Sequence, residues 1–195
     1  MILAIDTSAS SGSVALGDAG GVAASESFAE DGRRRHSAHL FRALEKLDVA
    51  ARPVSRIVVG LGPGSFSGIR VALAAAQGLA LPGGIPVFGV CSAWSVARQL
   101  AHVTRLGVFA DARRGEYYCT VYRCGVLERP TYLLAKESAE EEAGKMTLAV
   151  SAEPLPSIAE RRTPRAADYL ALAPGAPELA GGLLEPIYLR EAVAP

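Results

Sequence analysis

Apolar and polar residues alternate along the first ninety positions in a pattern that predicts short strands separated by tight turns. Five segments are short, apolar and bounded by turn residues: 2–5, 14–16, the segment ending at Phe28, 57–59 and 86–90. The first three follow one another through serine- and glycine-rich turns, which is typical of an antiparallel meander. The apolar, valine- and isoleucine-containing sequences of the last two predict buried strands.

Between these strands, the stretch 37–47 shows helical periodicity. Its apolar residues recur at helical spacing, and its charged residues fall on the opposite side. The apolar positions are Leu40, Phe41, Leu44 and Leu47. This spacing predicts an amphipathic helix.

The stretch 67–81 predicts a second helix of unusual composition. Only Arg70 and Gln77 interrupt small or apolar residues on every face. A helix that is apolar all round must be covered on both sides. Another subunit supplies one of those covers, or the helix is sandwiched within its own chain; the sequence leaves both alternatives open.

The second half of the chain begins with the pattern of a β-hairpin. An apolar run at 106–110 is followed by a charged turn at 111–115 and an alternating segment at 116–122. Two apolar or alternating segments around a short glycine-containing turn predict paired antiparallel strands.

Beyond the hairpin the pattern weakens. The acidic stretch 137–142 predicts a solvated helix face, and prolines interrupt the chain from 154 to 186. We place a boundary between two lobes near 100–106. The expected domains are therefore an N-terminal lobe, 1–104, and a C-terminal lobe, 105–195.

Composition predicts a soluble globular protein of one domain or two small lobes. Half of the 195 residues are hydrophobic, and 20 basic residues balance 20 acidic ones. A formal net charge of zero gives no global attraction to nucleic acid, so any RNA contact needs a local basic patch or a partner that supplies one. Composition thus argues against an autonomous RNA-binding protein.

Cysteine usage and the apolar runs indicate a cytoplasmic location. The three cysteines are an odd number, and none of their spacings is that of a zinc knuckle or a thioredoxin-like site. No basic segment followed by an apolar one opens the chain, and no apolar run is long enough to span a bilayer. We therefore expect neither export nor membrane insertion.

The stretch GLGPGSFSGIR is rich in glycine and hydroxyl groups, as many phosphate-binding loops are. It lacks the lysine and the glycine spacing of a Walker loop. Gly62, Gly64 and Gly68 are also spaced one residue too widely for the dinucleotide-binding fingerprint. A tight strand-to-helix turn capped by Ser65 or Ser67 is the favoured interpretation.

Asp6, Thr7 and Ser8 end the first strand. Actin-like and sugar-kinase-like folds keep an acid there for a metal-bound water and hydroxyls for phosphate. A turn stabilised by its own side chains at the end of a strand explains the same tripeptide at least as well.

His36 and His39 have a spacing that permits two metal ligands on a helix. Arg33, Arg34 and Arg35 lie beside them, and their positive field disfavours a bound cation. An exposed first helical turn is the favoured interpretation.

Asp111, Arg113, Arg114 and Glu116 concentrate four charges in one turn. Such a turn can hold an anion, dock a partner or solvate the tip of a hairpin. Because exposed charge pairs contribute little, the physics of the sequence favours the last of these.

Six motifs, in this order and spacing, resemble the TsaB family, a bacterial family of the tRNA threonylcarbamoyladenosine-forming machinery that was formerly grouped with "glycoprotease" proteins. They are ILAIDTS, HSAHL, GLGPGSFSGIRVALAAAQGLA, VFGVCS, DARRGEYY and PIYLR. The resemblance covers most of the chain, and the pair GPGSFSGIR and DARRGE is its most specific part. The segment LAVSAEP departs from the family, many of whose members keep a glycine-rich turn there.

The resemblance implies an α/β, actin-like and Hsp70-like (ASKHA) fold with ribonuclease H-like lobes, the second of them shortened. It also implies a non-catalytic protein. The catalytic paralogue TsaD has two metal-binding histidines after the related loop and helix, whereas FGVCSAWSVA contains no histidine. We therefore expect neither metal nor cofactor.

The implied function is a scaffold that binds and activates a TsaD-like transferase, joined by a TsaE-like ATPase, with a homodimer in isolation and tRNA contacted only through the complex. The resemblance assigns partner binding to two helices, at Leu40, Phe41, Leu44, Leu47, Arg70, Val71, Leu73 and Ala74. It assigns a vestigial phosphate site or loop-shaping role to Asp6, Thr7, Ser8, Gly62, Gly64, Ser65 and Gly68. It assigns an interlobe turn to Asp111, Arg113, Arg114 and Glu116.

Three rival functions remain. The first is a nucleotide-binding hydrolase or transferase that uses Asp6, Ser8 and Ser65 around a magnesium-bound phosphate. The second is a metalloprotease built on His36 and His39, for which no third ligand or general base is placed. The third is a self-associating module with no part in tRNA modification.

Overall fold

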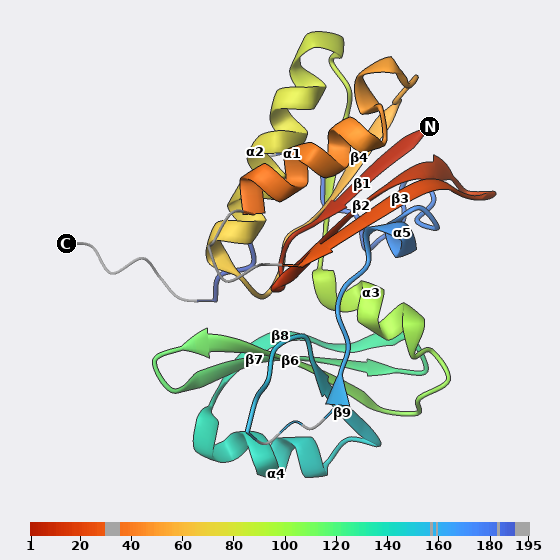
Figure 1. The fold of residues 1–195 in the computed structure, drawn as a ribbon. Helices are drawn as coiled ribbons and strands as arrows, with labels where there is room; N and C mark the ends of the chain where they lie inside the picture. Colours follow the sequence, from red (N-terminus) through yellow and green to blue (C-terminus); the bar gives the residue numbers. More distant parts are fainter. Residues whose placement is uncertain (30–35, 157, 159, 183, 190–195) are drawn as a thin grey trace.

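Two five-stranded sheets form the framework of the two lobes, which lie one above the other with helix α3 (Ser92–Gln99) between them (Figure 1). The computed structural model describes the chain except for residues 30–35, 157, 159, 183 and 190–195. None of the helices within this described part is long and apolar enough to cross a membrane.

The sheet of the first lobe has the strand order β3-β2-β1-β4-β5. Its strands are β1 (Ile2–Asp6), β2 (Ser11–Asp18), β3 (Gly21–Ala29), β4 (Arg56–Gly60) and β5 (Val87–Val90). The first three strands are antiparallel, and β4 and β5 run parallel to β1. Every residue of β1 and β4 is buried, because both faces of the sheet are covered. The predicted meander and the predicted buried strand at 57–59 are confirmed. The predicted strand at 86–90 forms as β5, but it lies at the edge of the sheet and only Gly89 and Val90 are buried.

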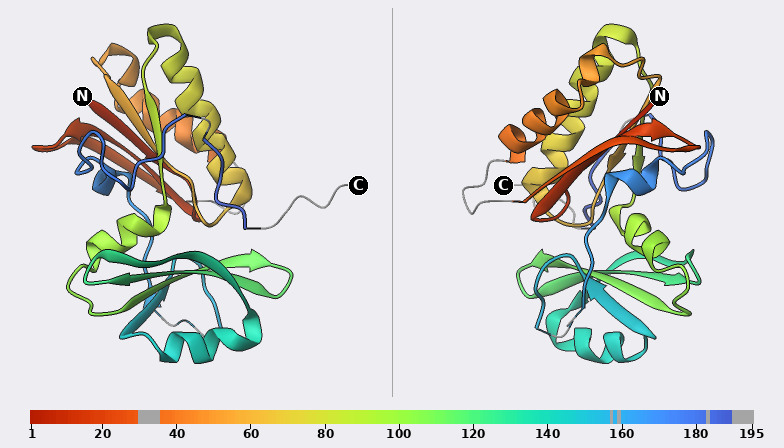
Figure 2. Two further views of the ribbon diagram at one scale, coloured as in Figure 1. Left: turned by 180° about the vertical axis from the view of Figure 1, so that it is seen from behind. Right: turned by 45° about the vertical axis from the view of Figure 1, so that its right-hand side comes forward.

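Helices α1 (His36–Lys46) and α2 (Phe66–Ala80) cover one face of this sheet (Figure 2). The short 3-10 helices η1 (Val49–Ala51) and η2 (Leu81–Gly83) follow them in the chain. Leu40 of α1 and Ile69, Ala72 and Ala76 of α2 are completely buried in the core that the helices form with the sheet. The chain itself therefore covers the inner side of α2. Ala74, Gln77 and Gly78 on its outer side are exposed.

The sheet of the second lobe has the order β10-β9-β6-β7-β8 and so repeats the third-second-first-fourth-fifth arrangement of the first. Its elements are β6 (Leu106–Arg113), β7 (Glu116–Arg123), β8 (Val126–Ala135), η3 (Lys136–Ser138), α4 (Ala139–Gly144), β9 (Leu148–Ser151) and β10 (Glu160–Arg161). The predicted hairpin is formed by β6 and β7, and the predicted acidic helix is α4. These lobes give the chain the expected two-lobed, actin-like α/β fold, and the second lobe has only short helices.

After β10 the chain returns to the first lobe. Helix α5 (Ala166–Tyr169) packs with Leu170 and Leu172 on the face of the first sheet opposite α1 and α2. Leu184 then joins the core beneath α1 and α2. A domain boundary at 104/105 stays a prediction, but the contacts of 166–172 and Leu184 are with the first lobe. Because prolines interrupt any periodic apolar pattern in this segment, the sequence did not predict these contacts.

Gly68→Ala and Gly78→Ala form a matched pair of substitutions within α2. A Cβ atom at Gly68 would lie 1.9 Å from the carbonyl oxygen of Thr7, whereas a Cβ at Gly78 would meet nothing within 4 Å. We expect Gly68→Ala to lower the free energy of unfolding by about 2 kcal/mol or more, because helix and strand must separate. Gly78→Ala should raise it by about 0.5–1 kcal/mol. Urea unfolding measures both, and equal effects would contradict this packing.

Candidate functional site

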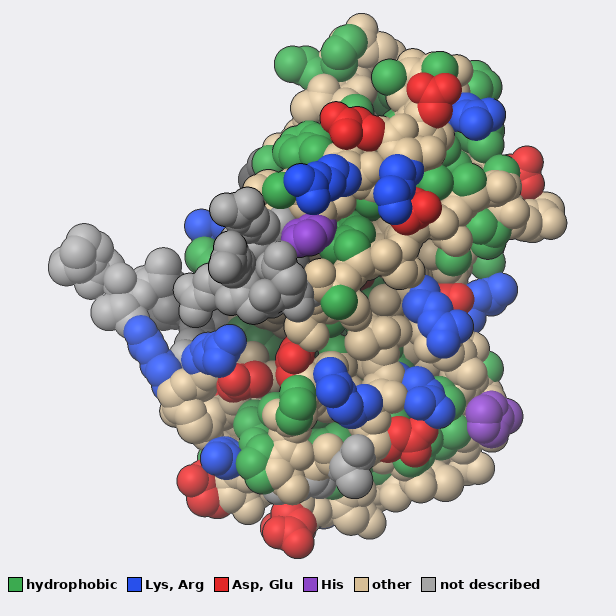
Figure 3. All heavy atoms as spheres, in the orientation of Figure 1, with side chains coloured by type: hydrophobic (Ala, Val, Ile, Leu, Met, Phe, Trp, Pro, Cys, Tyr) green, Lys and Arg blue, Asp and Glu red, His purple; other side chains and the backbone are tan. Residues whose placement is uncertain are grey.

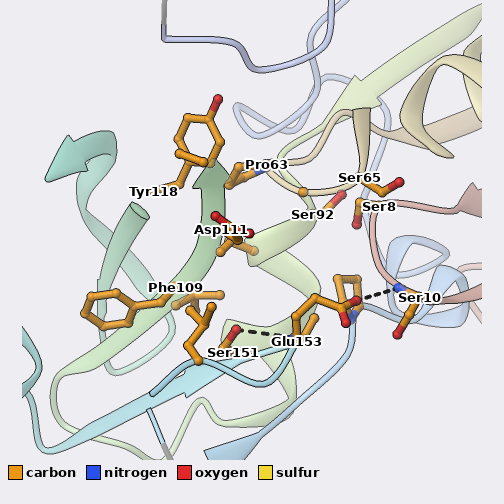
Figure 4. Close-up of a pocket in the computed structure, with 18 of the residues that line it drawn as sticks. Ser8, Ser10, Pro63, Ser65, Ser92, Phe109, Asp111, Tyr118, Ser151 and Glu153 are labelled. Atoms are coloured by element: carbon orange, nitrogen blue, oxygen red, sulfur yellow. Dashed lines mark hydrogen bonds between the residues drawn. The ribbon is translucent and has the colours of Figure 1, made fainter. Parts of the chain in front are cut away.

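A cleft of about 1150 Å³ lies between the lobes (Figure 4). The first lobe contributes the turn between β1 and β2, the glycine-rich loop before α2 and the start of α3. The second lobe contributes β6, the tip of the β6–β7 hairpin and the segment after β9. Many of the side chains facing this space carry hydroxyl groups, among them Ser8, Ser10, Ser65, Ser92 and Ser151.

The glycine-rich loop packs directly on the end of β1. A Cβ atom at Gly64 would lie 2.0 Å from the carbonyl oxygen of Ser8, so only glycine permits this approach. The amide of Ser65 donates to that same carbonyl at 2.7 Å, and the hydroxyl of Thr7 donates to the carbonyl of Gly68 at 2.7 Å. The hydroxyl of Ser65 accepts from the amide of Gly68 at 3.3 Å, which confirms the predicted helix cap. Gly62 has a φ of +85°, a conformation that favours glycine.

Asp6 is the buried carboxylate of the site, with 1% of its surface exposed. Its Oδ1 accepts hydrogen bonds from the amide and hydroxyl of Ser8, at 2.8 and 2.7 Å. Its Oδ2 accepts from the hydroxyl of Ser92 at 2.7 Å and from that of Tyr169 at 2.5 Å. Burial, and then the charge of Asp6, raise the pKa of Tyr169 well above its ordinary value, so its hydroxyl stays a donor.

These four donors satisfy the whole carboxylate. A carboxylate offers about four lone-pair positions, two on each oxygen. Since each oxygen of Asp6 already accepts two hydrogen bonds, neither has a position left for a metal-bound water. Sequence analysis found Asp6 and Ser8 but missed Ser92 and Tyr169. The apolar contacts of Tyr169 with the first sheet could not be inferred from a position 163 residues away.

Glu153 is a second carboxylate that sequence analysis did not select. Its Oε1 accepts a hydrogen bond from the amide of Ser10, across the cleft, at 2.6 Å (Figure 4). It belongs to LAVSAEP, the segment that departs from the family pattern, and this departure was the one signal that pointed to it.

The charged hairpin tip lies at the cleft. Arg113 and Arg114 line it and adopt φ angles of +64° and +54°. Asp111 stabilises this turn, because its carboxylate accepts from the amide of Arg113 at 2.7 Å and pairs with its guanidinium at 3.1 Å. Glu116 pairs with Arg113 in the strand register. The hairpin thus brings Asp111, Arg113 and Arg114 to the cleft, whereas Glu116 is not among the residues that line it.

The eight predicted partner-binding residues divide into two groups. The structure corrects the prediction for four of them, because Leu40, Leu44, Leu47 and Leu73 are at most 7% exposed and pack into the core of their own lobe. These side chains hold α1 and α2 on the sheet. The other four are at least partly accessible: Phe41, Arg70, Val71 and Ala74.

The described residues contain no group of three His, Cys, Asp or Glu side chains that could hold a metal ion. The ring of His39 stacks on that of Phe28, with the ring centroids 6.2 Å apart. The side chain of His36 and the arginines at 33–35 lie outside the described part of the chain.

A family model described as "TsaD: tRNA N6-adenosine threonylcarbamoyltransferase" matches residues 18–129. The tRNA threonylcarbamoyladenosine biosynthesis protein TsaB of Escherichia coli (strain K12) is 33% identical over 129 residues, 63% of this chain and 54% of the relative. The protein of the same name from Bacillus subtilis (strain 168) is 35% identical over 104 residues, 50% of this chain and 45% of the relative. These sequence matches therefore span only about half of the curated relatives.

Solved structures match over nearly their full length. One, the crystal structure of an uncharacterized protein with similarity to peptidase YEAZ from Pseudomonas aeruginosa, is 27% identical with a TM-score of 0.71, covering 97% of this chain and 99% of that one. The structure of YeaZ from Pseudomonas aeruginosa is 25% identical with a TM-score of 0.70, covering 96% and 99%.

Tyr169→Phe tests the closed hydrogen-bond shell of Asp6. Removing one donor to a buried carboxylate should lower the free energy of unfolding by about 1.5–3 kcal/mol. The matched control is Tyr188→Phe, whose hydroxyl contacts the carbonyl of Phe66 at 3.5 Å and the side chain of Arg70, meets no buried charge and should matter little. Urea unfolding of both variants measures the difference. The assignment is wrong if Tyr169→Phe is as stable as the unchanged protein.

Cysteine reactivity tests the burial of the thiols around the second sheet. Burial raises the pKa of Cys119 to about 12 and also raises the pKa of Cys91, whereas Cys124 is exposed. Because the thiolate is the reactive form, a disulfide reagent at pH 8 should label Cys124 rapidly and the other two only after unfolding. Mass spectrometry of the labelled peptides identifies the sites. Rapid native labelling of Cys119 would contradict the structure.

Proposed function

This chain belongs to the TsaD family, whose model matches more than half of it, and on that premise we propose that it is a non-catalytic scaffold subunit in tRNA threonylcarbamoyladenosine formation. In this proposal it binds and activates a TsaD-like catalytic paralogue, as a TsaB-type partner. The names of its curated relatives, which are tRNA threonylcarbamoyladenosine biosynthesis proteins, support this pathway.

The observation that carries the non-catalytic role is the saturation of Asp6. An acid that positions a metal-bound water needs an accessible oxygen, and both oxygens of Asp6 are occupied by donors from this chain. The position that an actin-like enzyme uses for chemistry serves here to hold the fold together.

The outer side of α2 is the surface we assign to the catalytic partner. Ala74 and Gly78 lie one helical turn apart and are exposed, so a second helix can approach the backbone closely there. Arg70 lies one turn before them, with its guanidinium 3.9 Å from the ring centroid of Phe66, and Phe41 of α1 is 52% exposed. Aromatic residues and arginine are enriched at protein interfaces, and the small residues beside them leave room for a second helix.

The remaining partners follow from the same proposal. A TsaE-like ATPase joins the pair, and in the absence of TsaD the same face pairs two copies of this chain. Because the formal net charge is zero, we propose that tRNA is contacted only through the assembled complex, in the cytoplasm.

One observation favours a second candidate, a nucleotide-binding hydrolase or transferase. The cleft is large, rich in hydroxyls and open to the start of α2, whose first-turn amides attract anions. Titration of the isolated chain with ATP and magnesium separates the two candidates, since tight magnesium-dependent binding belongs only to the enzyme.

Ala74→Glu tests the partner surface. A charge buried without a partner at an interface costs about 3 kcal/mol or more, so the affinity for the TsaD of the same organism should fall about a hundredfold or more. The variant should remain folded, because Ala74 faces solvent in the isolated chain. Titration calorimetry measures the affinity, and circular dichroism the fold.

The matched control is Ala171→Glu, an exposed position after α5 on the opposite side of the first sheet. It should bind TsaD as the unchanged chain does. Equal binding by Ala74→Glu and Ala171→Glu would overturn the assignment of this surface.

A further inference from the structure

The turn between β1 and β2 faces the segment that follows β9 across the cleft (Figure 4). The amide of Ser10 in this turn donates to Oε1 of Glu153 at 2.6 Å. The two residues are 143 positions apart and belong to different lobes. The cleft is therefore bridged by a carboxylate of the second lobe.

Glu153 is held in place from its own side. Its amide donates to the hydroxyl of Ser151 at 3.3 Å, and Ser151 is completely buried at the end of β9. A bond from a backbone amide to an ionised carboxylate is about twice as strong as a bond between neutral groups. This contact therefore joins an ordered turn of one lobe to an anchored residue of the other.

The contact is isolated from the other connections between the lobes. Where both partners are described, it is the one hydrogen bond that joins residues 1–90 directly to residues 106–161. The other contacts run through Cys91 just before α3, whose thiol lies 3.9 Å from the hydroxyl of Thr131 in β8, and through α3 itself, as in the apolar cluster of Val96 with Val108. A further set runs through the segment that returns after β10. Those connections lie where the chain crosses between lobes and can act as a hinge.

We propose that Glu153 is a latch that closes the cleft, with its carboxylate bound from the second lobe to the Ser10 amide in the β1–β2 turn of the first. The Ser10 amide is the donor on the first lobe, and the second lobe supplies the charged acceptor. Opening of the cleft requires this bond to break. This role belongs to the isolated chain and does not rest on the binding of TsaD.

Hydrogen exchange of the isolated full-length chain, followed residue by residue by nuclear magnetic resonance, tests the latch. In Glu153→Ala, the Ser10 amide should exchange about tenfold faster or more, the factor expected from losing one bond to a charged acceptor. Amides along the cleft in both lobes, at 64–67, at 151–153 and at 155, should also exchange faster in this variant. Small-angle X-ray scattering should give a larger radius of gyration for Glu153→Ala than for the unchanged chain, because its cleft opens.

Two further variants separate the latch from general effects of mutation. Glu153→Gln keeps an acceptor oxygen but loses the charge, so the protection of the Ser10 amide should fall between that of the unchanged protein and that of Glu153→Ala. Glu140→Ala removes an exposed carboxylate of α4 and should change nothing. The latch is overturned if Glu153→Ala leaves the Ser10 amide protected. It is equally overturned if Ser10 alone exchanges faster while the other cleft amides and the scattering stay unchanged, since the bond would then be local.

Discussion

The structure depends on the burial of one carboxylate, Asp6, at the point where the chain passes between the lobes. An ionised carboxylate removed from water is stable only when its oxygens are fully hydrogen-bonded. Ser8 satisfies one oxygen locally, while Ser92 and Tyr169 satisfy the other from the start of α3 and from α5. These two elements are where the chain leaves the first lobe and where it returns. The hydrogen bonds that satisfy the Asp6 carboxylate thus hold the start of α3 and helix α5 together at the end of β1.

Close packing around Asp6 explains why glycine occupies three positions in and beside the neighbouring loop. A Cβ at Gly60 would lie 1.9 Å from Oδ2 of Asp6, and Gly64 and Gly68 lie equally close to the backbone at Ser8 and Thr7. The loop that resembles a phosphate cradle in composition therefore serves to bring α2 against the end of β1. This packing of the loop fixes the position of α2. The exposed strip of small residues on α2 is the surface that we propose for the partner.

Local periodicity and glycine chemistry were sufficient to predict the meander, both helices of the first lobe, the β6–β7 hairpin and the cap at Ser65. They could not show what covers an apolar side chain. The family resemblance assigned Leu40 and Leu73 to a partner, and their spacing, which reveals a buried face, could not show that the chain's own sheet buries it. Tyr169 and Glu153 were missed for a related reason. Both act through contacts more than 140 residues away, within a proline-rich half that has no clear periodicity.

We propose above all that Asp6 has a structural and not a catalytic role. Reconstituted threonylcarbamoyl transfer to tRNA by TsaD, with this chain as the unchanged protein or as Asp6→Asn, tests that claim most directly. Complex formation is measured on the same samples, at a temperature at which both proteins are folded. We predict equal rates per assembled complex. A large loss of rate in fully assembled Asp6→Asn complexes would contradict the account and place Asp6 in the chemistry.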